Sequence, residues 1–426
     1  MKVARIIPVT GIGSEVEAEQ RATSATLAVL SIVNDLATAL LGPMGAPGAK
    51  RSRVEAFTEV YFGGASKRDR PDGLIVVTYG KTQWRALVEV KTGSGTLDAD
   101  QINRYWDIAR TERMNAVITI SNEIPAEHGS HPTPGLKVTA KSPVRVHHLS
   151  WSEVLLTARR IKDHTPIDDP EQSWLLNELI RYLEHPNSGA LTFDDMGPHW
   201  VAVREAAATK TLNSRSLGTE EVVTAWERLI GFAALRLSSA VGEDVRLVLA
   251  GDERKNRSRA LKSALCERGV LDATLRIPKT AGDLELEADL RAGQLTAAIS
   301  VRAPQDRGAR ARVTWLLNQV GGASPDLLVE SYPKNVKTPA VAPLGEIIED
   351  KRALLDDLRR DPCRFRVVAR TPMGSGRKSG RKSSFIESVL GLIDTFYDTV
   401  VQEIREWQPP TPQRLVSESE PQNEDE

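Results

Sequence analysis

Two carboxylates and one amine lie close together in the sequence, each in or beside a short apolar segment. Asp72 precedes the run Gly73–Tyr79, and Glu89 and Lys91 come at the end of the run Arg85–Val90. Both runs are rich in β-branched residues, which is typical of strands. Because side chains alternate along a strand, Glu89 and Lys91 must point to the same face.

The segment between the two runs is typical of a hairpin loop. A turn centred on Lys81 and Thr82 predicts an antiparallel pair in which Asp72 lies opposite Lys91 and shares a face with Glu89. Carboxylate oxygens suit Mg²⁺ or Mn²⁺, which also bind phosphate oxygens, and an ammonium beside them can orient or deprotonate an attacking water. The residues therefore predict a metal site with Asp72 and Glu89 as ligands and Lys91 as a catalytic lysine.

These residues resemble the signature of the PD-(D/E)XK nuclease superfamily, in which an acidic residue at a strand start is followed by Glu-x-Lys on the next strand. The matching segments are Pro71-Asp72 and Glu89-Val90-Lys91. The resemblance is limited to the N-terminal third of the chain. It implies an α/β fold with a restriction-endonuclease-like αβββαβ core, and a phosphodiester hydrolase that uses Mg²⁺ or Mn²⁺.

The order of elements predicted from the sequence is that of this core. The elements are a helix at Glu19–Leu41, strands at Ala56–Phe62, Gly73–Tyr79 and Arg85–Val90, a helix at Asp98–Glu112 and a strand at Ala116–Ser121. The alternative is an ordinary hairpin that carries an Asp and a Glu, with the stem of Lys91 packed along its end. The element order favours the nuclease interpretation.

Gln101 and Tyr105 are one turn apart on the predicted helix Asp98–Glu112. This pair resembles the Gln-x-x-x-Tyr element of the RecB-like branch of the superfamily. The resemblance implies that both side chains sit beside the metal site and contact nucleic acid. The alternative for Tyr105 is an ordinary core position, because tyrosines on amphipathic helices are commonly half-buried.

An additional acid from the first helix is expected from the same resemblance. Glu15, Glu17 and Glu19 compete, and only Glu15 and Glu19 extend the apolar stripe of this helix backward. We predict Glu19 as the catalytic acid, against the alternative that it is a solvated acid at a helix start. Glu55 and Glu59, which flank the first strand, are further candidates that the sequence does not rank.

Composition and net charge limit the classes of protein to which the chain can belong. The chain has 426 residues and a formal net charge of −1, so phosphate must be attracted by local patches rather than by the overall charge. Two isolated cysteines, Cys266 and Cys363, form neither a disulfide framework nor a zinc site, which predicts a reducing compartment. The N-terminus lacks the long apolar region of a signal peptide. We therefore expect a cytoplasmic protein that does not bind a membrane.

Four regions are predicted along the chain. They are a nuclease-like domain at 1–162, a helical linker region at 163–243, an α+β domain of unknown role at 244–407, and a disordered acidic tail at 408–426. Within them, His147 and His148 have no carboxylate or cysteine at metal-ligand spacing, so we expect ordinary hydrogen-bonded strand histidines. The last predicted helix is Ser384–Trp407. The α+β domain is expected to bind a protein partner or a second copy of the chain.

A tandem Gly-Arg-Lys-Ser at 374–383 lies between the last predicted strand and the last helix. Its spacing does not fit a P-loop, which argues against nucleotide hydrolysis and a nucleotide-binding regulator. Its cations, Arg377, Lys378, Arg381 and Lys382, are separated by Gly and Ser. This composition predicts a mobile basic loop that binds phosphates, with a solvated flexible linker as the alternative.

The function predicted from these residues is a Mg²⁺- or Mn²⁺-dependent nuclease that acts on DNA in preference to RNA. Restriction, repair or phage defence is the context that the resemblance implies. The main alternative is a non-catalytic nucleic-acid-binding or stress-response scaffold that keeps the nuclease fold. The complete set of Asp72, Glu89 and Lys91 argues against that alternative, because a buried cluster of charges is costly to keep without a use.

Overall fold

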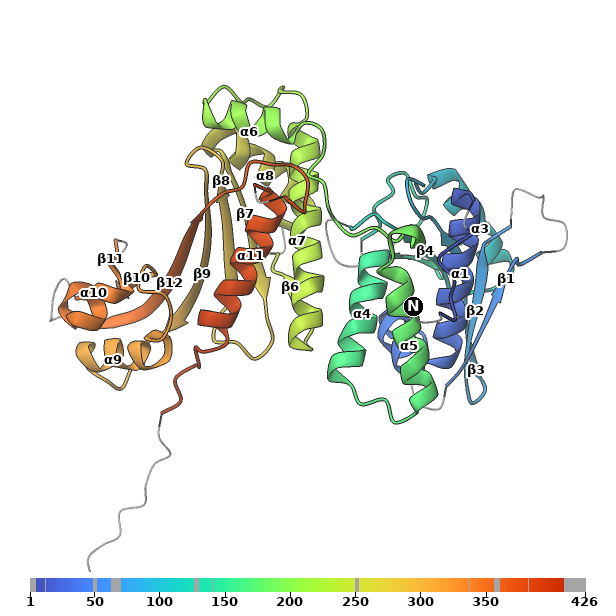
Figure 1. The fold of residues 1–426 in the computed structure, drawn as a ribbon, viewed down its shortest axis with the longest axis horizontal. Coiled ribbons are helices and arrows are strands. Elements are labelled where there is room, and N and C mark those ends of the chain that lie inside the picture. The colour runs from blue at the N-terminus through green and yellow to red at the C-terminus, as the bar shows by residue number, and fades with distance from the viewer. Residues whose placement is uncertain are drawn as a thin grey trace, which may run out of the picture. The chain divides into compact units, whose positions relative to one another are not determined.

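The computed structural model of the protein describes most of the chain (Figure 1). The described residues are 5–11, 13–48, 52–62, 70–125, 130–139, 141–249, 253–336, 338–355, 361–381 and 383–409. The tail predicted at 408–426 therefore lies outside the described residues from position 410 onward, as does Lys382.

The chain divides into two compact units. The first comprises Met1–Lys279, Asp283–Ala297 and Arg370–Thr395, and the second comprises Thr280–Gly282, Ala298–Ala369 and Phe396–Glu426. This division differs from the boundaries predicted near residues 162 and 243. Helices of the predicted linker pack on strands that follow it, as when the indole of Trp226 donates to the carbonyl of Asp272 at 3.0 Å.

The N-terminal part of the first unit is a mixed α/β structure. Its elements are α1 Glu15–Ile32, α2 Asn34–Leu41, β1 Arg53–Thr58, β2 Gly73–Tyr79, β3 Thr82–Val90, α3 Ala99–Thr111, β4 Ala116–Ser121, β5 Arg145–Ser150, α4 Trp151–His164 and α5 Pro170–Leu183. The strands form one sheet in the order β1-β2-β3-β4-β5, in which β1, β2 and β3 pair antiparallel and β3, β4 and β5 pair parallel. The mixed α/β class is confirmed.

The register of the β2–β3 hairpin corrects the predicted one. Tyr79 pairs with Thr82, so the turn is Gly80-Lys81, and Gly80 has a φ of +58°, which a glycine adopts without strain. The hairpin is therefore shifted by two residues from the prediction, and Asp72 comes beside Glu89 rather than opposite Lys91. Because side chains alternate with a period of two, the shift leaves the three side chains on the predicted face.

The predicted first helix, Glu19–Leu41, is two helices. Val33 between them has extended backbone dihedrals of φ −91° and ψ 91°. No single helix of the described residues is long and apolar enough to cross a membrane. The helices Glu15–Ile32 and Asn34–Met44 reach the required length and hydropathy only when they are taken together. The chain bends by 107° at the break between them. The first strand also differs from its prediction: it ends at Thr58, just before Glu59, whose φ is +57°.

The two faces of this sheet carry different side chains. On one face Val88, Val90, Ile118 and Leu149 pack with α1, α2, α4 and α5 in a large apolar core. The opposite face packs on α3 through a smaller apolar cluster that contains Leu87. Glu89 and Lys91 follow Leu87 on this second face, beyond its apolar part. The candidate site therefore lies where the apolar cluster under α3 ends.

The remaining elements build helices and a second sheet. They are α6 Trp200–Ala208, α7 Thr219–Val241, β6 Arg246–Leu247, α8 Glu253–Arg268, β7 Val270–Arg276, β8 Leu284–Asp289, β9 Gln294–Arg302, α9 Ala309–Val320, β10 Leu328–Pro333, β11 Ala340–Pro343, α10 Leu344–Glu349, β12 Pro362–Pro372 and α11 Phe385–Phe396. The strand order is β11-β10-β12-β9-β8-β7-β6. The predicted last helix, Ser384–Trp407, is shorter: α11 ends at Phe396, and a π-helical turn, Tyr397–Val401, follows it.

Candidate active site

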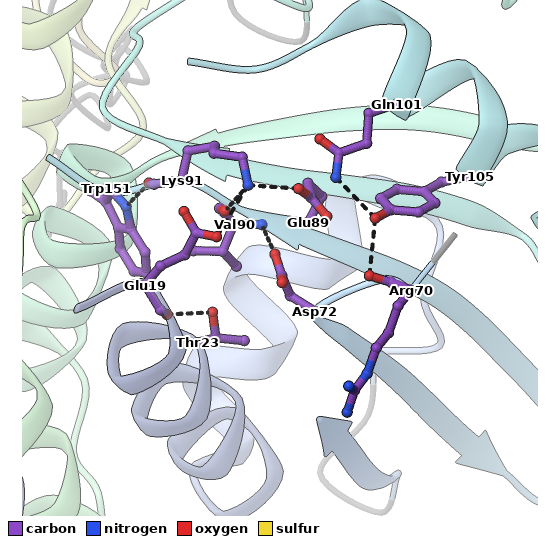
Figure 2. A network of polar contacts seen from close by, with 10 residues as sticks. All are labelled: Glu19, Thr23, Arg70, Asp72, Glu89, Val90, Lys91, Gln101, Tyr105 and Trp151. Carbon is purple, nitrogen blue, oxygen red and sulfur yellow. Dashed lines mark hydrogen bonds and ion pairs between the residues drawn. The ribbon is translucent and has the colours of Figure 1, made fainter. Parts of the chain in front are cut away.

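Four charged side chains from three segments meet at the end of β3 (Figure 2). Asp72 immediately precedes β2, Glu89 is the penultimate residue of β3, Lys91 follows β3, and Glu19 comes from the first turns of α1. The ammonium of Lys91 lies 2.7 Å from Glu89 Oε1, 3.1 Å from Glu19 Oε1 and 3.0 Å from the carbonyl oxygen of Val90. The structure thus brings together all four residues predicted as catalytic.

Backbone contacts fix Asp72 and Lys91 in this arrangement. The amide of Val90 donates to Asp72 Oδ2 at 2.8 Å, which holds the carboxylate against β3. The carbonyl of Lys91 accepts from the indole Nε1 of Trp151 at 2.8 Å, and its amide donates to the carbonyl of Ile120, also at 2.8 Å. Trp151 is a part of the site that the sequence did not indicate, because its role depends on α4 packing beside β3.

Burial sets the protonation of the carboxylates. The side chain of Glu89 is 2% exposed, and loss of solvation, with a smaller contribution from Asp72, raises the pKa of Glu89 to about 8. Burial also raises the pKa of Asp72 above its ordinary value, although the hydrogen bond from Val90 lowers it in part. Burial likewise raises the pKa of Glu19, although the charge of Lys91 lowers it in part. One ammonium is therefore shared among three carboxyl groups that cannot all be ionised at neutral pH.

Opposing effects act on the pKa of Lys91. Burial alone would lower the pKa of Lys91, but the neighbouring carboxylates, led by Glu89, raise it above its ordinary value. We infer that Lys91 is charged throughout the neutral range. The proton that the cluster keeps at neutral pH is on a carboxyl group, with Glu89 the most deeply buried.

The oxygen atoms fit a divalent cation. Glu89 Oε2 is buried and has no hydrogen-bond partner within 3.5 Å among the described residues, although Asp72 and the hydroxyl of Tyr105 lie close enough for Glu89 to affect the pKa of both. An unpaired buried carboxylate oxygen is costly, and a cation would satisfy it while lowering the raised pKa values around it. The described residues form no cluster of three or more His, Cys, Asp or Glu suited to a metal. Asp72 and Glu89 would therefore be completed by water and phosphate oxygens, as is usual for Mg²⁺.

Gln101 and Tyr105 lie beside this cluster, on α3. Gln101 Nε2 donates to the hydroxyl of Tyr105 at 3.0 Å, and this hydroxyl donates to the carbonyl of Arg70 at 3.0 Å (Figure 2). The ring of Tyr105 is 1% exposed and belongs to the apolar cluster under α3. Tyr105 is thus a core residue whose hydroxyl holds the segment that leads to Asp72. Direct contact of either side chain with nucleic acid stays a prediction.

The other candidate acids have different partners. Glu15 accepts from the hydroxyl of Ser94 at 2.7 Å, and Glu17 accepts from the amide of Gly13 at 2.6 Å. Glu55 pairs with Arg53, and Glu59 pairs with Arg70. Among these acids and Glu19, only Glu19 contacts the ammonium of Lys91 in the described structure.

A row of buried polar side chains crosses the sheet beside Glu89, and two of its members are hydrogen-bonded to each other. Glu89 pairs with Thr119 of β4, and Thr119 pairs with His148 of β5, so the three side chains form one row on the α3 face. Thr119 Oγ1 lies 2.9 Å from His148 Nδ1 and 2.9 Å from Nε2 of His131. Burial lowers the pKa of His148 to about 3 and that of His131 to about 4. Both histidines are therefore neutral. His148 is hydrogen-bonded, as predicted, whereas Nε2 of His147 is buried without a partner among the described residues.

The basic loop makes backbone hydrogen bonds to a distant segment, which its composition did not predict. The amide of Met196 donates to the carbonyl of Arg377 at 2.9 Å, and the amide of Ser379 donates to the carbonyl of Asp194 at 2.8 Å. Arg377 also lies 3.6 Å from a carboxylate oxygen of Asp195. No local pattern predicts this pairing, because the two segments are about 180 residues apart. Lys378 and Arg381 of the loop are exposed.

Comparisons of the chain with protein-family models, with curated proteins and with solved structures found no match. The function is therefore inferred from the residues of the site and from the fold that positions them.

Proposed function

We propose that the chain is a metal-dependent nuclease that hydrolyses phosphodiester bonds in DNA, with RNA as the second choice. The observation that carries the proposal is the cluster of Asp72, Glu89 and Glu19 around Lys91, in which one carboxylate oxygen of Glu89 is buried without a partner. An excess of buried carboxylates over ammonium groups is a destabilising arrangement that a divalent cation would relieve. The order αβββαβ of the N-terminal elements supports a restriction-endonuclease-like core.

Each residue has a role that its position allows. Asp72 and Glu89 would hold Mg²⁺ or Mn²⁺. The cation would lower the pKa of a bound water and offset negative charge on the phosphate. The ammonium of Lys91, already within 2.7 Å of Glu89, orients the attacking water and stabilises the charge that develops on the phosphate. Glu19 keeps Lys91 at this position. The hydrogen bond from Trp151 fixes the backbone from which the lysine extends.

A direct cleavage assay tests the proposal. Purified protein is incubated with single- and double-stranded DNA and RNA, each with Mg²⁺, Mn²⁺ or EDTA. We expect DNA to be cleaved with either metal and to stay intact in EDTA. If all four substrates stay intact with both metals, the nuclease proposal is wrong. Binding of nucleic acid under those conditions would then favour the non-catalytic scaffold.

A further inference from the structure

Two aromatic side chains beside the site are exposed to solvent. Phe57 of β1 is 48% exposed, and Tyr61, which follows this strand, is 64% exposed. Phe57 pairs with Leu74, and Leu74 pairs with Leu87, so Phe57 lies on the face of the sheet that also carries Glu89. On this face α3 packs on β3 and β4, whereas β1 is the edge strand.

Tyr61 is linked to the site through Arg70. The guanidinium of Arg70 lies over the ring of Tyr61, 5.2 Å from its centroid. Arg70 is two residues before Asp72, and its carbonyl accepts the hydroxyl of Tyr105 at 3.0 Å (Figure 2). The hydrogen bonds that fix Asp72 and those that fix Arg70 thus act on one short segment. An aromatic ring with a cation on it is thereby attached to the segment that leads to Asp72.

The charge of Arg70 is accessible to a phosphate. Arg70 pairs with Glu59 at 2.5 Å, but the two side chains are 39% and 70% exposed. Ion pairs this exposed are weak, so a phosphate oxygen can replace Glu59 as the partner of Arg70. A stacked aromatic ring and an adjacent cation together match the two parts of a nucleotide, its base and its phosphate.

We propose that Tyr61, with Arg70 beside it, stacks an unpaired base of a single-stranded DNA whose backbone passes Asp72. The inference rests on the proposed nuclease function and narrows its substrate to a single strand. Stacking on an aromatic ring tolerates any base, because every base has a π-face. A base inside a duplex is stacked on its neighbours and reaches such a ring only after unpairing, which costs energy. The platform therefore favours single-stranded over double-stranded substrate.

A binding assay without metal separates this inference from catalysis. The probes are a fluorescein-labelled 12-nucleotide oligothymidine and a mixed-sequence 12-base-pair duplex, measured by anisotropy in EDTA with the full chain. We expect Tyr61→Ala to weaken binding of the single strand about tenfold and binding of the duplex less than twofold. Tyr61→Trp should bind the single strand at least as tightly as the wild type. Arg70→Gln should lower the salt dependence of binding by about one phosphate contact.

Tyr79 provides the matched control. It is 48% exposed and lies at the end of β2 away from Asp72, so Tyr79→Ala should leave binding of the single strand unchanged. The inference is wrong if Tyr61→Ala binds the single strand as the wild type does, or if Tyr61→Ala and Tyr79→Ala weaken it equally. If binding depends on Tyr61 but no metal-dependent cleavage is found, the stacking inference is supported and the nuclease proposal is wrong. If Tyr61→Ala cleaves single strands as the wild type does, the nuclease proposal is supported and the stacking inference is wrong.

Discussion

The ammonium of Lys91 is the point at which the site's charges meet. It contacts Glu89 at 2.7 Å and Glu19 at 3.1 Å, and Asp72 is held beside them by the amide of Val90. A purely structural ion pair would need one carboxylate for one ammonium. The additional buried acids leave Glu89 with a pKa of about 8, which lowers stability unless another cation binds. The excess of acids is the reason that we propose a bound divalent cation at this site.

The carboxylates can be tested with variants of the same shape. Asp72→Asn keeps an acceptor for the amide of Val90, and Glu89→Gln removes a buried acid without removing its volume. We expect each variant to lower metal-dependent cleavage at least about a hundredfold, because both carboxylates are needed to hold the cation. Above pH 8, where burial disfavours the ionised carboxylate of Glu89, the melting temperature of Glu89→Gln should equal or exceed that of the wild type, since a buried charge is removed. Full cleavage by both variants would contradict the proposed metal site.

Lys91 can be separated from the metal ligands by Lys91→Met. The thioether keeps most of the packing of the stem and removes the charge, so the carboxylates lose their only ammonium partner among the described residues. Binding of Mn²⁺ measured by calorimetry should stay the same or become tighter. The cleavage rate should fall by about a hundredfold or more, as for loss of one transition-state contact. If metal binding and rate fall together, Lys91 has a structural role.

At the scale of elements, the chain of hydrogen bonds through Thr119 has a defined direction. His148 Nε2 faces the carbonyl of Glu123 at 2.8 Å and must donate to it, so its Nδ1 accepts from Thr119. Nδ1 of His131 accepts from the amide of Thr133 at 3.1 Å, and its Nε2 then donates to Thr119. A second proton on either ring would disrupt this chain. The network thus fastens residues 131–133 of the β4–β5 loop to the sheet only while both histidines are neutral.

Stability should therefore depend on pH through His148. Its folded-state pKa of about 3 lies below the unfolded value, so its contribution to stability is present above about pH 6.5 and is lost as the pH falls toward 3. Between pH 6.5 and 4.5 the wild type should lose roughly 2 kcal/mol of unfolding free energy that His148→Gln does not lose. Urea unfolding of both proteins at several pH values measures this difference. Parallel curves would show that His148 does not carry the effect.

The sequence was sufficient for the local part of the site but not for its long-range contacts. Strand alternation predicted that Glu89 and Lys91 share a face, and the apolar stripe of the first helix singled out Glu19 and Glu15. The predicted turn position was wrong by one residue because Gly80 adopts a positive φ without strain and so favours a turn at Gly80-Lys81. Such a one-residue shift of a turn moves the paired register by two.

Contacts between distant segments gave no such pattern. The indole of Trp151 reaches Lys91 across 60 positions, and Thr119 joins two histidines from different segments. Helix α8 was not predicted, because the sequence of Glu253–Arg268 is highly charged and only Leu261 and Leu265 are apolar, buried side chains in it. Tertiary packing rather than local propensity determines each of these features.

At the scale of the whole molecule, the balanced charge leaves DNA affinity to local cations. The basic loop is one such group, and backbone hydrogen bonds attach it to Asp194 and Met196 within the first unit. A fixed cationic loop loses less conformational entropy on binding than a mobile one does. Its side chains still have no geometry suited to chemistry, because Lys378 and Arg381 are exposed and separated by Ser and Gly.

Neutralising Arg377, Lys378, Arg381 and Lys382 to Gln should weaken DNA binding similarly for all sequences. The salt dependence of binding should fall by up to about four phosphate contacts, with little change in the maximal rate at saturating DNA. Asp195→Asn is the matched control, since it removes the partner of Arg377 and keeps every cation of the loop. An unchanged salt slope in the quadruple variant would mean that the loop does not bind phosphate.

The row Glu89, Thr119 and His148 has a consequence for evolution and design. These side chains are 1%, 0% and 8% exposed, yet none is apolar, so one row of a buried sheet face contributes little hydrophobic stabilisation. Natural proteins keep such locally frustrated positions where function requires them. Random libraries selected for thermal stability alone should therefore replace Glu89 first, because Thr119 and His148 are hydrogen-bonded to each other and Glu89 has an unpaired buried oxygen. The selected variants should be more stable and should not cleave DNA, so that selection for stability would by itself identify a residue of the proposed active site.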